Sequence, residues 1–131
     1  MRQGAALRQG ASLAVAAWLV GCTAAGAQTQ LANPASQRCI ASGGTLQMER
    51  REDGGQFGVC VFAGNRLCEE WAMFRGACPV GGVTVPGEMV SAARYCLITG
   101  GRLDVAGTAC ALPGGKTCEV ESYWAGGCGR Q

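Results

Sequence analysis

The chain has 131 residues, of which 9 are cysteine and 22 glycine, and it contains no histidine. So many cysteines in a short chain indicate a disulfide scaffold rather than a cytosolic enzyme. A formal charge of +2, with no basic stripe of interleaved aromatic residues, argues against nucleic acid as a partner.

Residues 1–21 are predicted to be a lipoprotein signal peptide. Arg2 and Arg8 give the segment a basic start, and an apolar run from Ala11 to Val20 follows. A helix of about ten residues spans about 15 Å, half of a bilayer core. The run therefore predicts a cleaved signal rather than a permanent membrane span.

The apolar run ends in Leu19-Val20-Gly21-Cys22, which resembles the lipobox of bacterial lipoproteins. In a lipobox the cysteine thiol receives a diacylglyceryl group, so we expect lipidation at Cys22 and a stable membrane anchor. Residue 23 is Thr rather than Asp, which by the same resemblance implies the outer membrane, facing the periplasm. Residues 22–32 are mostly small and polar and would form a flexible tether.

A second processing site competes with the lipobox. Ala25-Gly26-Ala27 suits ordinary signal peptidase, and cleavage after Ala27 would release a soluble periplasmic or secreted chain. Both routes leave eight cysteines for pairing, so cysteine parity does not decide between them.

The eight remaining cysteines fall into two sets with matching spacing. The sets are Cys39, Cys60, Cys68, Cys78 and Cys96, Cys110, Cys118, Cys128. The last two steps are 8 and 10 in both sets, and only the first differs, 21 against 14. The residues in between agree as well, because 39–44 matches 96–101 and 60–69 matches 110–119. The sequence therefore predicts a first repeat domain at 33–78, a linker or short connecting strand at 79–89, and a second, divergent repeat domain at 90–131.

Each repeat is expected to belong to the α+β class, as a helix, a β-hairpin and a short helix stapled by disulfides. In the first repeat Asn33 suits a helix N-cap and Pro34 the first helical position. Gly43-Gly44 would end this helix. In the second repeat we expect Ser91 as the cap and Gly100-Gly101 as the stop.

The predicted hairpin has arms near 45–51 and 57–62, turned by Asp53-Gly54-Gly55. The extra residues of the first repeat would lengthen this hairpin. Gly64-Asn65 predicts a second tight turn. The segment 68–75 predicts the second short helix, on which Trp71 and Phe74 would share a face with Cys68.

Repeats of about 45 residues bury too little apolar surface to offset chain entropy unaided, so two disulfides per repeat are expected. Four cysteines allow three pairings, and the sequence does not choose among them. We prefer the pairs Cys39–Cys60, Cys68–Cys78, Cys96–Cys110 and Cys118–Cys128. The first bond of each set would tie helix to hairpin, and the second would tie the final helix to its own tail.

The first repeat resembles a known family on the segments Asn33–Ser36, Gly43-Gly44, Gly58–Cys60 and Cys68–Cys78. These are similar to the small bacterial domain of unknown function 333, whose members are often lipoproteins and are commonly labelled haemolysins. The resemblance implies placement in the cell envelope and the cysteine pairing preferred above. The second repeat departs from the family: it lacks the Asn-Pro pair, has Glu121 in place of Trp71, and carries Trp124 displaced along the helix.

No catalytic, metal or cofactor site is predicted. Without His, a Ser–His or Cys–His nucleophile pair is impossible, and pairing of all eight cysteines leaves no catalytic thiol. Steps of 8 and 10 lack the close cysteine pairs typical of zinc sites. Adjacent Glu69 and Glu70 would diverge on a helix, which predicts a solvated helix start rather than an acid pair.

The leading hypothesis is a non-enzymatic envelope module that binds a protein or another cell-surface component and is held at the membrane by its lipid. Trp71 and Phe74 are expected in the core; otherwise Trp71, Phe74 and Arg75 form the candidate binding surface. One alternative is a protease inhibitor that presents the hairpin Glu49–Gly55. Membrane lysis, as the family label implies, and a thiol-redox role are further alternatives.

Overall fold

The computed structural model describes residues 33–128. The predicted signal peptide (1–21), lipidation at Cys22, the alternative cleavage after Ala27 and the tether (22–32) lie outside the described residues. No helix in the described range is long and apolar enough to cross a membrane. Helices and antiparallel sheets make up the fold, which confirms the α+β class.

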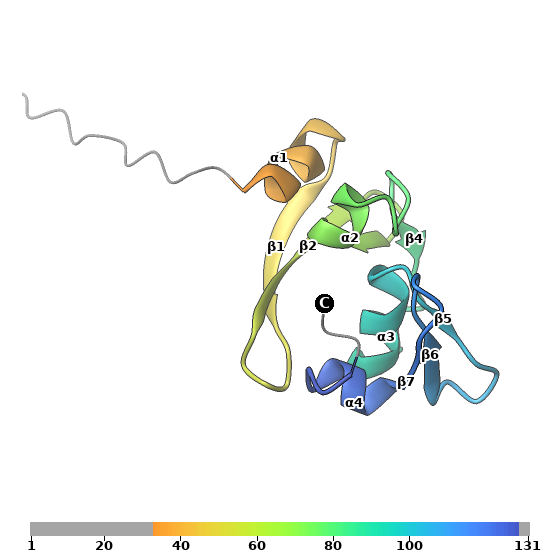
Figure 1. The fold of residues 1–131 in the computed structure, drawn as a ribbon. Coiled ribbons are helices and arrows are strands. Elements are labelled where there is room, and N and C mark those ends of the chain that lie inside the picture. Colours follow the sequence, from red (N-terminus) through yellow and green to blue (C-terminus); the bar gives the residue numbers. More distant parts are fainter. Residues whose placement is uncertain (1–32, 129–131) are drawn as a thin grey trace, which may run out of the picture.

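Two halves of the chain run through the same series of elements (Figure 1). The N-terminal half, residues 33–78, contains α1 (Pro34–Ala41), β1 (Thr45–Arg50), β2 (Gln56–Phe62), β3 (Arg66–Glu69) and α2 (Glu70–Phe74). The C-terminal half, residues 90–128, contains α3 (Ser91–Ile98), β5 (Arg102–Leu103), β6 (Ala109–Ala111), β7 (Thr117–Glu119) and α4 (Val120–Trp124). Between them, β4 (Val83–Thr84) joins the first sheet, whose strand order is β1-β2-β3-β4; the second sheet is β5-β6-β7.

The first helix begins and ends as its sequence predicts. The Asn33 side chain accepts hydrogen bonds from the backbone N–H groups of Ala35 and Ser36, and Pro34 is the first helical residue. Gly43, just after the helix, has φ +84°, a conformation that glycine adopts without strain. The cap predicted for the second helix is wrong, because Ser91 is its first residue and Val90 occupies the cap position without a side-chain hydrogen bond.

Each half has a third strand that the sequence analysis missed. The predicted helix 68–75 is shorter, because β3 continues to Glu69 and only Glu70–Phe74 is helical. Gly64 (φ +76°) and Asn65 (φ +56°) form a tight turn that folds β3 back on β2, with Cys60 opposite Cys68. Cys68 therefore lies on a strand and shares no helical face with Trp71 and Phe74.

The structure forms the four disulfides preferred from the sequence, Cys39–Cys60, Cys68–Cys78, Cys96–Cys110 and Cys118–Cys128. Each bond stays within one half. A Cβ atom at Gly44 would lie 2.3 Å from the Cys60 sulfur, and one at Gly101 would lie 2.4 Å from the Cys110 sulfur. The second glycine of each Gly-Gly pair thus makes room for the disulfide packed against it.

Three apolar clusters hold the fold together, one within each half and one between the halves. The shared cluster joins Phe57, Val59 and Leu67 of the first sheet to Tyr95 and Ile98 of α3. Val85, just after β4, is 3% exposed and belongs to the same cluster. Segment 79–89 therefore contains a short connecting strand, β4, one of the two predicted forms, within a longer loop, and the halves share a core.

Candidate functional site

A cleft of about 650 Å³ lies between the two halves, within the size range of ligand sites. The N-terminal half contributes the β1–β2 hairpin and α2, and the C-terminal half contributes α3, the turn at 112–114 and the end of α4. Its lining mixes aromatic, cationic and carboxylate side chains: Phe57, Trp71, Tyr95, Tyr123, Arg51, Arg75, Glu69 and Glu70.

The aromatic wall of the cleft is assembled from both halves. Tyr95 of α3 packs against Phe57 at 5.2 Å between ring centroids, against Tyr123 at 5.0 Å and against Trp124 at 5.3 Å. The Tyr123 hydroxyl donates to Thr99 Oγ1 at 3.1 Å. Burial raises the pKa of Tyr123, so this phenol stays neutral at physiological pH.

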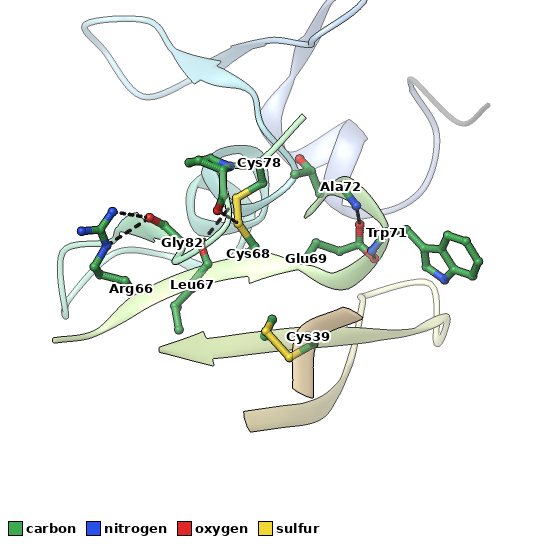
Figure 2. Close-up of a disulfide and its surroundings, with 12 residues drawn as sticks. Cys39, Arg66, Leu67, Cys68, Glu69, Trp71, Ala72, Cys78 and Gly82 are labelled. Atoms are coloured by element: carbon green, nitrogen blue, oxygen red, sulfur yellow. Dashed lines mark hydrogen bonds between the residues drawn. A yellow bond between two sulfur atoms is a disulfide. The ribbon is translucent and has the colours of Figure 1, made fainter. Parts of the chain in front are cut away.

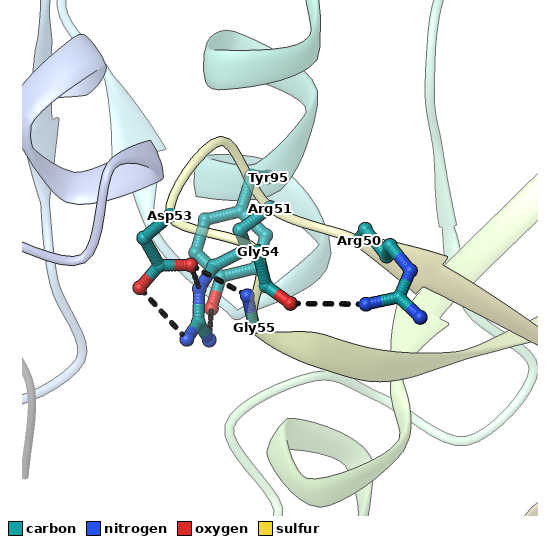
Figure 3. Close-up of polar contacts among 6 residues, drawn as sticks. All are labelled: Arg50, Arg51, Asp53, Gly54, Gly55 and Tyr95. Carbon is teal, nitrogen blue, oxygen red and sulfur yellow. Dashed lines mark hydrogen bonds and ion pairs between the residues drawn. The ribbon is translucent and has the colours of Figure 1, made fainter.

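The longer hairpin of the N-terminal half reaches across to the C-terminal half (Figure 1). Arg94 of α3 donates two hydrogen bonds to the Glu49 carboxylate, at 2.7 and 2.8 Å. At the hairpin tip Arg51 pairs with Asp53 at 3.1 Å and donates to the Tyr95 hydroxyl at 3.4 Å (Figure 3). The hydrogen bond from Arg51 to Asp53, followed by that to Tyr95, raises the pKa of Arg51 above its usual value, so its charge is permanent.

This contact bears on the inhibitor hypothesis, which requires the segment 49–55 to be presented to a protease. The Arg51 N–H donates to the Gly55 carbonyl at 2.8 Å, and the Gly55 N–H donates to the Asp53 side chain at 2.9 Å. The segment is a tight hairpin turn in which the side chains of Glu49, Arg51 and Asp53 bind within the molecule. Its geometry favours a clamp between the halves over a presented loop.

Glu69 is a buried helix cap rather than a solvated residue. Its side chain is 6% exposed and accepts hydrogen bonds from the backbone N–H groups of Trp71 (3.0 Å) and Ala72 (2.7 Å) (Figure 2). Burial raises the pKa of Glu69, against the opposing effect of the two N–H donors. The prediction of a solvated start fails here because Glu69 ends a strand inside the fold.

Glu70 is also buried, at 3% exposure. Its carboxylate accepts a hydrogen bond from Asn33 Nδ2 at 3.0 Å and another from the Ser36 hydroxyl. A Cβ atom at Gly58 would lie 2.6 Å from the Glu70 carboxyl carbon, so a side chain at 58 would displace it. The prediction that this residue is exposed to solvent is also wrong, because its side chain turns toward α1. The sequence analysis missed this group of residues. The available signal was that all four, Asn33, Ser36, Gly58 and Glu70, occur in the segments that carry the family resemblance.

Trp71, Phe74 and Arg75 lie together on the surface. Trp71 is 37% and Phe74 44% exposed, and their rings meet edge to face at 5.5 Å. Figure 2 shows the Trp71 side chain extending away from the disulfide core. The expectation that both are core residues is wrong, because the short helix α2 buries its other face through Ala72 and Met73. The second expectation, a surface formed by Trp71, Phe74 and Arg75, matches their placement; we call it the α2 surface.

Residues 33–128 contain no free thiol. All eight cysteines of this range are disulfide-bonded. No group of three or more His, Cys, Asp or Glu side chains there is arranged to hold a metal ion.

Residues 30–77 match the model of a protein family described as Domain of unknown function (DUF333). This match supports the resemblance noted for the N-terminal half. No curated protein and no solved structure matches the chain.

Proposed function

We propose that this protein is a lipid-anchored, non-enzymatic binding module of the bacterial cell envelope, and that it holds its ligand in the cleft between two copies of one duplicated unit. The cleft carries the proposal, because it is the place where both halves bring aromatic and charged side chains together.

Several features support a duplication. Both halves have the order helix, three strands, helix, and both form a longer-range and a shorter-range disulfide in the same places. A glycine lies against the first disulfide in each half, Gly44 in one and Gly101 in the other. Equivalent residues thus form the same two disulfides in each half, and we call these disulfides the covalent frame.

Binding is favoured over catalysis by what the carboxylates do. Glu69 and Glu70 would be the natural acid or base groups of the cleft, yet each already accepts two hydrogen bonds from its own half. The walls are held by four disulfides and by the Glu49–Arg94 pair, and such preorganisation lowers the entropy lost on binding. Arg75 borders the cleft as an exposed cation, which favours a ligand with anionic or polar groups.

The anchor rests on sequence features, namely the apolar run before Cys22 and the lipobox resemblance. Intact mass spectrometry of protein extracted from membranes tests it. We expect a chain that starts at Cys22, carries acyl groups and contains four disulfides. A lipid-free chain that starts at Gln28 would refute the anchor.

Site-specific photo-crosslinking in intact cells tests the cleft. A photoreactive amino acid at Met48, which lines the cleft and is 58% exposed, should form adducts with the ligand. The same group at Val105, which is fully exposed on the far loop and does not line the cleft, is the matched control. Equal labelling from both positions, or turnover of a substrate by the purified protein, would contradict the proposal.

A further inference from the structure

We infer that the α2 surface, formed by Trp71, Phe74 and Arg75, rests against the phospholipid membrane to which the protein is anchored. The inference depends on the lipid anchor proposed above, and goes beyond it by assigning an orientation and a contact surface.

The folded part begins next to this surface. Asn33, the first described residue, donates a hydrogen bond to Glu70, which directly precedes Trp71. Asn33 and Trp71 also border the same cleft. The chain that leads to Cys22 therefore leaves the folded part beside α2.

The length of the tether limits how the folded part can turn. For a generic flexible linker of eleven residues, the length of the segment 22–32, the average end-to-end distance is about 18 Å. A folded unit of about 100 residues has a radius of gyration of about 13 Å and is therefore roughly 30 Å across. A tether whose average reach is less than the width of the folded part disfavours orientations in which the attachment side, and with it the α2 surface, points away from the bilayer.

The chemistry of the α2 surface suits a phospholipid interface. Trp71 and Phe74 expose about two fifths of their surface, and Trp is enriched where an apolar body meets water at a membrane surface. Arg75 follows at the end of α2 and supplies a cation for lipid phosphate. Aromatic side chains beside a basic residue are typical of interfacial contacts.

The C-terminal half lacks this surface. Glu121 stands where the N-terminal half has Trp71, and Ala125 where it has Arg75. Trp124, at the position of Phe74, packs against Phe57 and Tyr95 in the shared core. Of the two equivalent helices, only α2, which lies beside the tether, therefore carries the Trp, Phe and Arg that suit a membrane surface.

The two tryptophans that follow Cys22 provide the test. The lipidated full-length protein is reconstituted into vesicles of phosphatidylethanolamine and phosphatidylglycerol with or without brominated acyl chains, which quench tryptophan only on contact. The Trp124→Phe variant reports on Trp71 alone, and the Trp71→Phe variant reports on Trp124 alone. We expect bromolipid to quench about half of the Trp71 emission and to leave Trp124 almost unchanged, because only Trp71 lies at the interface.

Arg75→Glu should reduce the quenching of Trp71 in these anionic vesicles, because a like charge repels the lipid headgroups. Unquenched Trp71 in a protein that carries its acyl chains would overturn the inference and leave the anchor intact. Equal quenching of both tryptophans would overturn the orientation. Release of a vesicle-entrapped dye would overturn the inference of a peripheral membrane contact in favour of lysis. A protein that carries no acyl chains would refute the anchor itself.

Discussion

The two halves share a covalent frame but differ in what fills it. In the N-terminal half a buried carboxylate, Glu70, binds the N-cap side chain of α1 and one side chain within α1, and packs on a glycine. In the C-terminal half the equivalent positions are apolar or uncharged. Counted from the cysteines, Asn33, Ser36, Gly58 and Glu70 correspond to Val90, Ala93, Thr108 and Val120.

This difference separates the features that both halves need for their fold from the polar network that only the N-terminal half contains. Helix α3 has the same length as α1 although its cap position has no side-chain hydrogen bond. Val120 is 4% exposed where Glu70 is 3% exposed, so both positions are equally interior. The disulfides and their glycines are common to both halves, whereas the polar network is specific to the N-terminal half and is therefore not required for the shared architecture.

The largest effect should come from placing the carboxylate where its partners are missing. Val120→Glu buries a charge with no Asn or Ser donor nearby and should lower the free energy of unfolding by about 3–5 kcal/mol. Urea unfolding with intact disulfides measures this. The reverse change, Ser36→Ala with Glu70→Val, should cost less than about 2 kcal/mol, because the carboxylate leaves together with its Ser36 donor and the remaining partner, Asn33, is only partly buried and can bind water. Equal losses in the two variants would refute the distinction between frame and network.

Removing the first disulfide of each half should have a similar effect in both. Cys39→Ala with Cys60→Ala, and Cys96→Ala with Cys110→Ala, should each cost about 3 kcal/mol. The bonded residues are 21 and 14 positions apart, so loop entropy predicts a difference of only about 0.3 kcal/mol. Denaturant midpoints of the two double variants test this, and a difference of several kcal/mol would show that the halves depend unequally on their frames.

Removing a helix cap should destabilise the two halves to different, smaller extents. Glu69 caps α2 with one buried and one partly buried hydrogen bond, whereas Glu119 caps α4 with one exposed hydrogen bond of 3.3 Å. We expect Glu69→Ala to cost about 1–2 kcal/mol and Glu119→Ala less than about 0.5 kcal/mol. The thermal unfolding midpoints of the two variants should fall in that order, and the opposite order would count against the cap geometry.

The clamp between the halves should contribute modestly. Arg94 and Glu49 keep about a quarter of their side-chain surface exposed, so their ion pair is screened by solvent. A double-mutant cycle of Arg94→Ala and Glu49→Ala should give a coupling energy of about 0.5–1 kcal/mol. A coupling energy of zero would mean that the aromatic cluster alone joins the halves.

The smallest predicted effect is a pH dependence within the short loop of the C-terminal half. Backbone N–H donation from Ala109, with further donation from Thr108, holds the pKa of Asp104 below its usual 3.8. A lowered pKa in the folded state means that this carboxylate stabilises the protein above its unfolded pKa and loses that effect as pH falls through the folded value. Asp104→Asn should therefore lower the unfolding midpoint at neutral pH but not at a pH well below 3.8. A difference that persists in acid would refute this origin.

Local sequence signals predicted much of the local structure, whereas the cysteine pairing was a preference that the family resemblance implied and the spacing alone did not decide. Asn33-Pro34, Gly43-Gly44 and Asp53-Gly54-Gly55 act within a few residues of themselves, so their effects follow from the sequence alone. The third strand was missed because residues 66–69 have no pattern that separates a strand from the first turn of a helix. Only the pairing of Cys68 opposite Cys60 decides between them.

The cleft was beyond prediction because it depends on how the halves pack. Nothing in the sequence indicates that Phe57 meets Tyr95 and Trp124, since these residues are brought together by the shared core. Glu69 and Glu70 were misjudged for the same reason: adjacent carboxylates look solvated until their partners in other elements are known. The α2 surface was predicted only as an alternative, because a five-residue helix is too short for periodicity to identify its buried face.

Every disulfide joins cysteines that are consecutive along the chain, at separations of 10 to 21 residues. If the amino-terminal end enters an oxidising compartment first, each cysteine can bond to the next one to arrive, and no mispaired bond has to be broken later. An oxidase alone would then complete this protein, with no need for the enzymes that reshuffle mispaired thiols.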